Sequence, residues 1–262
     1  MTTSLSPRTL GIDAAPSAPG PIPFSRLVRV EWAKATDTRA ARWLLALVAL
    51  STAGIMLAPI LAPARFDQTY TSYLEVASIA QVILLPVVGI LMFTGEWSQR
   101  SVMITFTQEP RRIRVLNAKL TASLILGGGA AVFGGVVTAA GLGLAAASGR
   151  TLEGTLSVGD IAGYLLYLLL NVLGGVAVGA LLQSSATAIA AYFALNIAFH
   201  LLGTASTLIA CWIDTATTWN WVLDNEWGGH VPQISVSTLF WVVVPLAAGA
   251  IRTLRRDRKS VV

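Results

Sequence analysis

Six long apolar stretches constrain the fold of this 262-residue chain more than any other feature. They cover about residues 43–62, 76–94, 120–147, 161–182, 186–213 and 236–254. A helix needs roughly twenty apolar residues to cross a hydrocarbon core, and each stretch supplies about that many or more. Only 12% of the residues are charged, whereas soluble domains carry about 25%. We therefore expect an all-α membrane protein with six transmembrane helices, and no soluble enzyme or nucleic-acid-binding domain.

The distribution of basic residues predicts how these helices are oriented. Sixteen of the eighteen Arg and Lys residues lie before residue 43, in the loop of residues 95–119, or after residue 251. The loops on the alternate side hold the other two, Arg65 and Arg150. Basic loops stay in the cytoplasm, so both termini and the 95–119 loop are expected to be cytoplasmic. The even number of spans gives the same arrangement independently.

The residues outside the apolar stretches form two tails and an amphipathic segment. Residues 1–23 hold five of the eleven prolines and predict a disordered cytoplasmic tail, whereas residues 255–262 are a basic cytoplasmic tail. In residues 24–42, Phe24, Leu27, Val28, Trp32 and Ala35 recur at helical spacing. They predict an amphipathic helix in the plane of the membrane interface. Glu31 falls among these apolar side chains, so it either fills a gap or faces a protein partner.

Two irregular features are expected near the fifth stretch. This stretch, like the third, is longer than a bilayer needs, which predicts tilt or an irregular end in both. The segment that follows it, residues 214–235, is acidic and rich in tryptophan. Within this segment, Trp219, Trp221 and Val222 predict a short piece of chain that dips into the outer leaflet.

Motifs for nucleotide, metal and acyl-transfer chemistry are absent from the sequence. A Walker A loop needs a lysine after a glycine, and none of the three lysines has one before it. The single cysteine, Cys211, excludes an internal disulfide and a four-cysteine zinc site. Two histidines are too few for an intramembrane metalloprotease. We expect neither a cofactor, nor a metal, nor enzymatic activity in this chain.

Polar residues within the stretches are the usual functional leads in a membrane protein. Here they are Gln81, Asn171, Asn196 and His200. Asn196 and His200 are four residues apart and share one helix face. Such side chains either form interhelical hydrogen bonds or line a path for a substrate or a proton. A proton relay is disfavoured because no Asp or Glu lies in the middle of a stretch.

Small residues recur at every fourth position in the third and fourth stretches. One stripe consists of Gly135, Ala139, Gly143 and Ala147, and the other of Gly175 and Gly179. Such stripes let helices approach closely. The contact lies either inside the bundle or at a dimer interface, and the sequence leaves both open.

The loop of residues 95–119 is the most informative segment outside the stretches. Its apolar members are Val102, Met103 and Phe106, and its basic members are Arg100, Arg111, Arg112, Arg114 and Lys119. Pro110 is placed to start a helix that enters the third stretch. A loop that only anchors the chain to lipid headgroups accounts for the arginines. It leaves Glu96, Trp97 and the apolar side chains unexplained.

Motifs in this loop and before the first span carry a family resemblance. The loop reads Gly95-Glu-Trp-Ser-Gln-Arg-Ser-Val, followed by Glu109-Pro-Arg-Arg and Ala118-Lys-Leu120, and the amphipathic segment contains Glu31-Trp-x-Lys34. Together with six spans and an N-terminal amphipathic helix, these motifs resemble ABC-2 type permeases, the transmembrane subunits of ABC exporters. The chain departs from the common pattern at Trp97, where Tyr or Phe is commoner, and at Ser101, where Thr is commoner.

The resemblance implies a transporter subunit without its own motor. In that family, two permease subunits pair with two cytoplasmic ATPase subunits, which bind the ATP and Mg²⁺. The implied fold has an interfacial elbow helix before the first span and a cytoplasmic coupling helix between spans 2 and 3. The implied location is the prokaryotic plasma membrane, with the lipid bilayer around the chain and no nucleic-acid partner. The implied cargo is a hydrophobic or amphipathic compound.

The resemblance also assigns expected roles to individual residues. Those expected to contact the ATPase are Glu31, Lys34, Glu96, Trp97, Arg100, Val102, Met103 and Phe106. Those expected to orient the loop against lipid headgroups are Pro110, Arg111, Arg112 and Lys119. Asn171, Asn196 and His200 are candidates for the translocation path.

Two other classes of function are left open by the sequence. A membrane adaptor or immunity-type protein would bind a partner without transporting anything. An ion-coupled secondary transporter usually needs intramembrane carboxylates or broken helices. The six stretches lack a central carboxylate, which disfavours the second of these classes.

Overall fold

The computed structural model describes residues 22–98 and 111–255 of the chain. About 87% of these residues are helical, and no strand occurs within the two ranges. Within the two described ranges, six helices are long and apolar enough to cross a membrane. They cover Arg39–Leu61, Tyr70–Gly95, Ile113–Ala147, Val158–Leu182, Ser185–Ala205 and Trp227–Leu254. The prediction of a helical, multi-pass membrane protein is confirmed.

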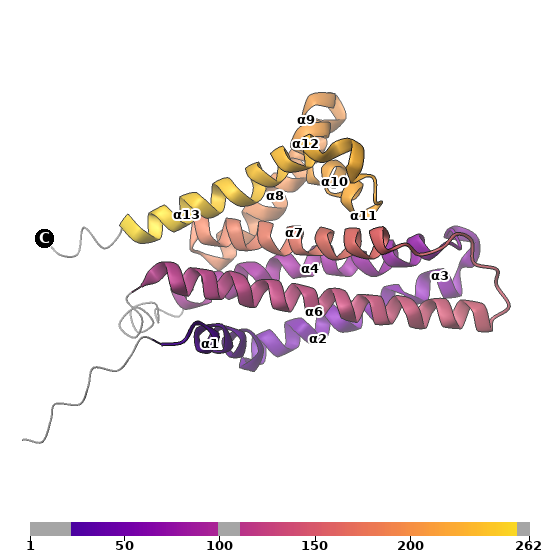
Figure 1. Ribbon diagram of the computed structural model, residues 1–262, viewed down its shortest axis with the longest axis horizontal. Helices are drawn as coiled ribbons and strands as arrows, with labels where there is room; N and C mark the ends of the chain where they lie inside the picture. Colours follow the sequence, from indigo (N-terminus) through magenta and orange to yellow (C-terminus); the bar gives the residue numbers. More distant parts are fainter. Residues whose placement is uncertain (1–21, 99–110, 256–262) are drawn as a thin grey trace, which may run out of the picture.

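The helices form a bundle whose long axis follows the spans (Figure 1). The spans consist of α2 (Arg39–Ile55) with α3 (Leu57–Leu61), α4 (Tyr70–Ser98), α6 (Arg112–Ala147), α7 (Val158–Leu182), α8 (Ser185–Ala205), and α12 (Trp227–Thr238) with the π-helix η2 (Leu239–Val243) and α13 (Val244–Arg255). The start of the first helix, the end of α4, the start of α6 and the end of α13 lie at one end of the bundle. We call this the terminal end and the opposite one the loop end.

Helices α4 and α7 form the centre of the bundle. In their most apolar windows, 67% of the α7 residues and 61% of the α4 residues are buried, against 11% for α8. Glycines bring the two helix backbones together: a Cβ atom on Gly89 would lie 2.7 Å from the Val172 carbonyl oxygen, and one on Gly179 would lie 3.2 Å from the Ile90 Cα. The stripe that contains Gly179 therefore serves packing inside the bundle.

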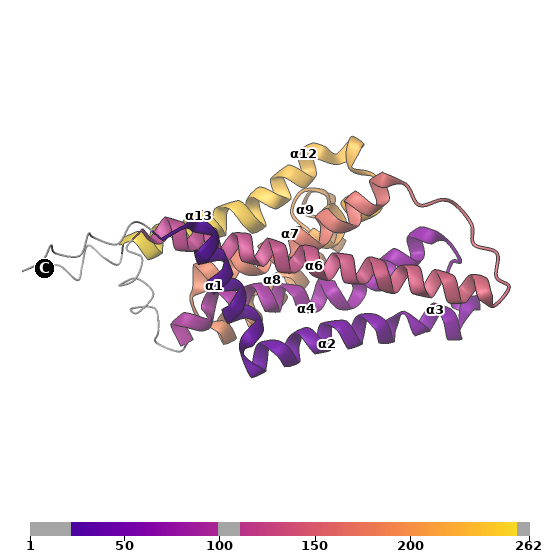
Figure 2. The same cartoon turned by 60° about the horizontal axis from the view of Figure 1, so that its bottom comes forward.

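Helix α1 (Phe24–Asp37) runs across α6 at the terminal end and ends beside the start of α2 (Figure 2). The sequence predicted one amphipathic helix over residues 24–42, but α1 ends earlier. Thr38 has an extended backbone, and its hydroxyl accepts a hydrogen bond from the Ala41 N–H, which caps α2. A threonine N-cap favours a new helix at this point, so the chain turns and the first span begins at Arg39.

At the loop end, a single arginine holds the turn after the first span. The Arg150 guanidinium donates hydrogen bonds to the carbonyl oxygens of Pro59 and Ile60, at 3.0 and 2.6 Å. These carbonyls belong to the last residues of α3, where helical partners are missing and a positive charge is favourable.

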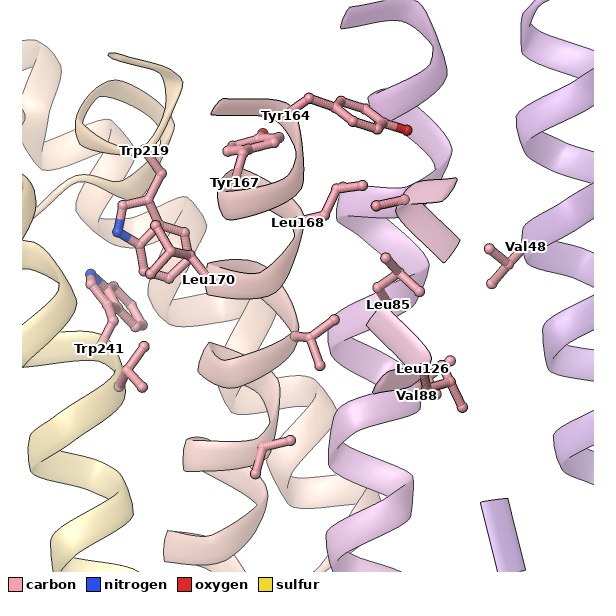
Figure 3. Packing of buried hydrophobic residues seen from close by; sticks show 14 of the residues in the cluster. Val48, Leu85, Val88, Leu126, Tyr164, Tyr167, Leu168, Leu170, Trp219 and Trp241 are labelled. Carbon is pink, nitrogen blue, oxygen red and sulfur yellow. The ribbon is translucent and has the colours of Figure 1, made fainter. Parts of the chain in front are cut away.

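The fifth span has the irregular end that its length predicted. Helix α8 stops at Ala205 because Ser206 adopts an extended conformation. Three short helices follow, α9 (Thr207–Trp212), α10 (Thr215–Thr218) and α11 (Asn220–Leu223). This segment folds back into the bundle and buries Trp219 and Val222. A Cβ on Gly174 of α7 would lie 3.3 Å from the Trp219 ring, and Figure 3 shows that ring beside Leu170, close to Trp241.

The last span begins at Trp227, nine residues before the predicted start at residue 236. Gly228, Gly229 and Pro232 stand in its first turns, and these residue types form helices poorly. Because of these residues, the sequence pattern placed the start of the last span too late.

Candidate functional site

Two clusters of polar side chains stand out in the described part of the chain. The first, at the terminal end, consists of Glu31, Lys34 and Lys119, and we call it the Glu31 cluster. The second lies between α8, α10 and α12. It consists of Asn196, His200, Asp214, Thr215, Thr217, Thr218 and Ser237, and we call it the Asp214 network.

The Glu31 cluster joins α1 to α6 through a buried carboxylate. One oxygen of Glu31 lies 2.7 Å from the Lys119 Nζ, and the other lies 2.7 Å from the Lys34 Nζ. The side chains of Glu31 and Lys119 are 6% and 7% exposed. A second bond supports the same junction, because the Arg114 guanidinium donates to the Ile22 carbonyl at 2.6 Å.

This geometry answers one question that the sequence left open. Both oxygens of Glu31 are engaged by lysines of the same chain, so the carboxylate fills a gap between helices. Lys119 was expected to lie against lipid headgroups, but its side chain points inward to Glu31 because α1 crosses α6 at this level. Removing one partner of such a buried pair typically costs about 3–5 kcal/mol, since a charge is left without compensation.

Several residues that we expect to couple to an ATPase lie, by their place in the sequence, near the same end of the bundle. Glu96 and Trp97 belong to the last turn of α4, Arg111 immediately precedes α6, and Arg112 is its first residue. For Glu96, Trp97 and Arg112 the structure describes the backbone alone. Arg100, Val102, Met103, Phe106 and Pro110 also lie outside the described residues.

Two of the polar residues within the spans form hydrogen bonds between helices. Gln81 of α4 donates to the Ala130 carbonyl of α6 at 2.8 Å and accepts from the Tyr164 hydroxyl of α7 at 2.7 Å. Asn171 is buried in α7, donates to the Tyr167 carbonyl at 2.9 Å and accepts from the Tyr192 hydroxyl of α8. Both arrangements correspond to the packing alternative, in which buried polar groups hold neighbouring helices together.

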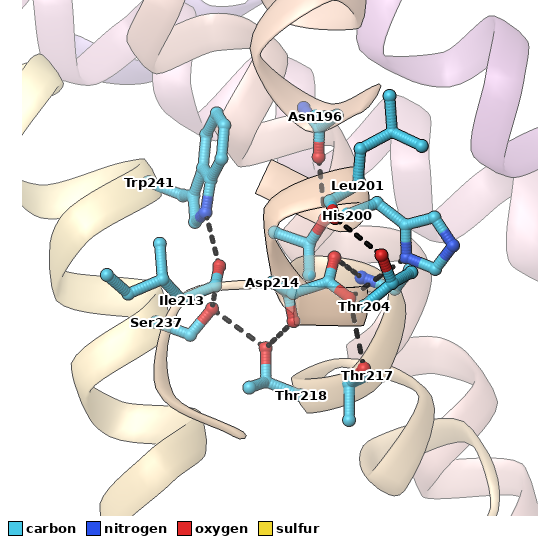
Figure 4. A network of polar contacts seen from close by, with 12 residues as sticks. Asn196, His200, Leu201, Thr204, Ile213, Asp214, Thr217, Thr218, Ser237 and Trp241 are labelled. Carbon is cyan, nitrogen blue, oxygen red and sulfur yellow. Dashed lines mark hydrogen bonds and ion pairs between the residues drawn. The ribbon is translucent and has the colours of Figure 1, made fainter. Parts of the chain in front are cut away.

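The Asp214 network is centred on a carboxylate that is 2% exposed (Figure 4). Asp214 is the N-cap of α10 and accepts from the Ala216 N–H at 3.1 Å. Its other oxygen accepts from the Thr217 hydroxyl at 3.0 Å and lies 3.0 Å from the Nδ1 of His200. The buried carboxylate therefore connects the segment after α9 to the fifth span.

Further bonds extend the network to the last span. The Thr218 hydroxyl donates to the Asp214 carbonyl at 2.9 Å and lies 2.8 Å from the Ser237 hydroxyl of α12. The Trp241 indole donates to the Ile213 carbonyl at 2.7 Å. On the α8 side, the Thr215 hydroxyl donates to the Asn196 amide oxygen at 2.6 Å. Short helix α10 is thus held between two spans by polar contacts.

Asp214 is the site residue that sequence reasoning missed. The pattern assigned it to an outer loop, whereas the structure packs it against His200 in the fifth span. Two signals pointed to it: the fifth stretch was eight residues too long for α8, and Asp before Thr-Ala-Thr is a helix-capping pattern. Neither signal says against which helix the capped segment folds.

The other acidic residues of this segment are in different surroundings. Asp224 and Glu226 are exposed, between α11 and α12. Partial burial, followed by the neighbouring charge of Glu226, raises the pKa of Asp224 above its ordinary value. Like charges and desolvation disfavour a carboxylate, so this position destabilises the charged form. Of these three acids, Asp214 is the one that the fold surrounds with hydrogen-bond donors.

The chemistry available to the two clusters differs. The Glu31 cluster is closed within the chain, whereas the His200 side chain is 57% exposed. Over residues 22–98 and 111–255, no group of three His, Cys, Asp or Glu side chains is arranged to hold a metal ion. A comparison with protein-family models and with curated proteins finds no match for this chain, so its functional assignment rests on the geometry of these clusters.

Proposed function

We propose that this chain is the permease subunit of an ABC transporter of the ABC-2 type. It exports a hydrophobic or amphipathic compound across the prokaryotic plasma membrane, with both termini in the cytoplasm. A separate cytoplasmic ATPase subunit binds ATP and Mg²⁺, and a second permease copy or a homologous permease completes the translocation path. The chain itself is no enzyme.

The observation that carries this proposal is the buried pair of Glu31 and Lys119. Lys119 lies in the second turn of α6, directly after the 99–110 connection that bears the coupling motif. Glu31 belongs to α1, which crosses the same end of the bundle. The pair ties the helix that leaves the connection to the helix before the first span.

A force on the connection would therefore reach several spans together. It enters α6 at Arg112 and passes through the Glu31 cluster into α1, which also contacts α2 and α4. Closing of an ATPase dimer against this end would rock these helices as a body, which is a common form of switching between two states. A subunit with this role needs no phosphate-binding loop of its own.

The exposure of α8 supports a second permease copy. Only 11% of its most apolar window is buried, and its His200 side chain is 57% exposed. A polar group that faces hydrocarbon costs free energy. A second subunit, or a water-filled path between two subunits, removes this cost.

A pull-down from the native membrane tests the proposed function. The tagged chain is extracted in a mild detergent, and its partners are identified by mass spectrometry. We expect a soluble subunit with a Walker A motif to co-purify and to hydrolyse ATP. Changing Glu96→Ala together with Arg100→Ala should release this subunit or uncouple its ATP hydrolysis from transport.

A matched control distinguishes coupling from a general loss of charge. Arg65→Ala with Glu153→Ala also removes one acid and one base, both exposed, but at the loop end. This variant should keep the ATPase bound. Absence of an ATPase under several detergents would contradict the transporter assignment and favour an adaptor.

A further inference from the structure

A group of exposed arginines lies at the terminal end of the bundle. Two belong to α1 and two to the first turn of α2, and we call them the basic patch: Arg26, Arg29, Arg39 and Arg42. Within residues 22–98 and 111–255, no ion pair or hydrogen bond engages their guanidinium groups. By contrast, Arg150 and Arg252 donate to backbone carbonyl oxygens. The basic patch therefore has its hydrogen-bond donors available for a ligand outside the chain.

The packing of α1 decides which of its faces such a ligand can reach. Glu31 and Ala35 are buried against the bundle, and Glu31 is paired with Lys119 of α6. With about 3.6 residues per turn, Arg26 and Arg29 fall on the opposite side of the helix. The apolar face of α1 is thus used for packing within the chain, and its basic face is turned to the surroundings.

Helix α2 continues from the basic patch as an exposed apolar stripe. Members of this stripe are spaced four, four and three residues apart, so they share one helix face: Arg39, Trp43, Leu47 and Leu50. Trp43 and Leu50 are 78% and 71% exposed, whereas Val48 on the other face is buried. Figure 2 shows α2 along an edge of the bundle. The stripe therefore faces the lipid around the protein.

This order of side chains corresponds to the order of groups in a phospholipid. Guanidinium groups bind phosphate oxygens through paired hydrogen bonds, and indole rings prefer the level between headgroups and acyl chains. One leaflet contributes about 15 Å of hydrocarbon, which is about ten residues of helix. The positions of Arg39 and Leu50 differ by eleven residues. An acyl chain that lies along the leucines therefore brings its headgroup to the level of the arginines.

We propose that the basic patch and the α2 stripe form a binding site for an anionic phospholipid. Arg39 and Arg42 bind the phosphate, Trp43 lies beside the glycerol backbone, and the leucines contact an acyl chain. Arg26 and Arg29 add positive charge beside the headgroup. The proposal goes beyond the proposed function, because it holds for a transporter and for an adaptor alike.

The charge of this region favours an anionic lipid over a zwitterionic one. Residues 24–43 contain five basic and two acidic residues, and Glu31, one of the acids, is already paired with lysines. A lipid with a net negative headgroup is attracted by this surplus. In phosphatidylcholine the quaternary ammonium cancels the charge of the phosphate and is itself repelled by arginine. A basic residue beside an anionic lipid surface contributes about fivefold to affinity.

Native mass spectrometry of the full-length chain tests the proposal. The protein, in a mild detergent and without an ATPase, is titrated with phosphatidylglycerol and with phosphatidylcholine of the same acyl chains. We expect tighter binding of phosphatidylglycerol. Arg39→Gln together with Arg42→Gln should weaken this binding by about fivefold for each arginine and leave that of phosphatidylcholine unchanged.

Arg65→Gln is the matched control, because it removes an exposed arginine at the loop end. It should leave the binding of both lipids unchanged. A loss as large as that of the double variant, or no loss in the double variant, would overturn the site. Equal affinity of the unaltered chain for the two lipids would also overturn it, and this comparison needs no variant to fold.

Inorganic phosphate separates a lipid site from a simple anion site. It should not displace phosphatidylglycerol at equal concentration, because it makes no contact with the α2 stripe. Displacement would overturn the assignment to a lipid. Since the chain is titrated alone, failure of the lipid site would leave the proposed function untouched, and loss of the ATPase in the pull-down would leave the lipid site untouched.

Discussion

The Glu31–Lys119 and Asp214–His200 pairs have similar chemistry but opposite relations to their surroundings. Both partners of the first pair are less than one-tenth exposed, and a second lysine completes the coordination of the carboxylate. In the second pair the acid is buried and the base is more than half exposed. The first pair is therefore enclosed by the chain, whereas the second leaves more than half of the His200 side chain exposed.

The comparison shows what burial of a charge pair contributes. A pair enclosed on all sides fixes the relative position of two helices, and its charges need each other because water cannot replace either partner. A half-exposed pair fixes the acid but leaves the base open to exchange with its surroundings. We infer that the Glu31 cluster transmits position, whereas the Asp214 network holds a buried acid and leaves the His200 ring exposed.

The largest effect is expected when the closed pair is broken. Glu31→Gln removes the carboxylate that both lysines contact and leaves Lys119 buried. The free energy of unfolding, measured by denaturant titration in detergent micelles, should fall by about 3–5 kcal/mol. Asp37→Asn, on the exposed side of the same helix, serves as the control and should change it by less than about 0.5 kcal/mol. Equal effects of the two substitutions would contradict the stabilising role of the Glu31 cluster.

An intermediate effect is expected when the acid of the half-exposed pair is changed. Asp214→Asn weakens hydrogen bonds to three donors while it keeps the shape of the side chain. The same titration should show a loss of about 1–3 kcal/mol. Asp224→Asn is the matched control: its carboxyl has a raised pKa, so neutralising it should leave stability unchanged or slightly higher. A loss at Asp224 as large as that at Asp214 would contradict the distinction.

The smallest effect is expected at the exposed base. His200→Gln should cost about 1 kcal/mol at most, because more than half of the side chain makes no contact within the chain and one hydrogen bond is at stake. A cost as large as that of Asp214→Asn, measured by thermal unfolding in buffers of equal ionic strength, would break the comparison with the closed pair.

Most of the fold was predictable from the sequence because the bilayer restricts what a chain can do. A span needs about twenty apolar residues in one helix, and that pattern is visible without knowledge of neighbours. The start of the last span was missed because Gly228, Gly229 and Pro232 resemble loop residues in isolation. Their helical state depends on the packing around them.

The candidate sites were less predictable, because both depend on contacts between distant residues. Glu31 stood out on an apolar face, but its partner Lys119 lies 88 residues away, and only the crossing of α1 over α6 joins them. His200 was recognised as a polar residue within a span, whereas its carboxylate was assigned to a loop. The fold-back after Ser206 depends on contacts with α7, against which Trp219 and Val222 are buried, and no local pattern encodes these contacts.

The order of synthesis gives the fold-back after α8 a further meaning. Every group that bonds the Asp214 carboxylate lies between residues 200 and 217, so all of them leave the ribosome before the last span does. The Asp214 carboxylate can therefore form its hydrogen bonds during insertion, before α12 has been synthesised. Ser237 and Trp241 then dock onto a segment that is already in position. In this view the Asp214 network assists assembly, because it orders the surface onto which the sixth span packs before that span has been synthesised.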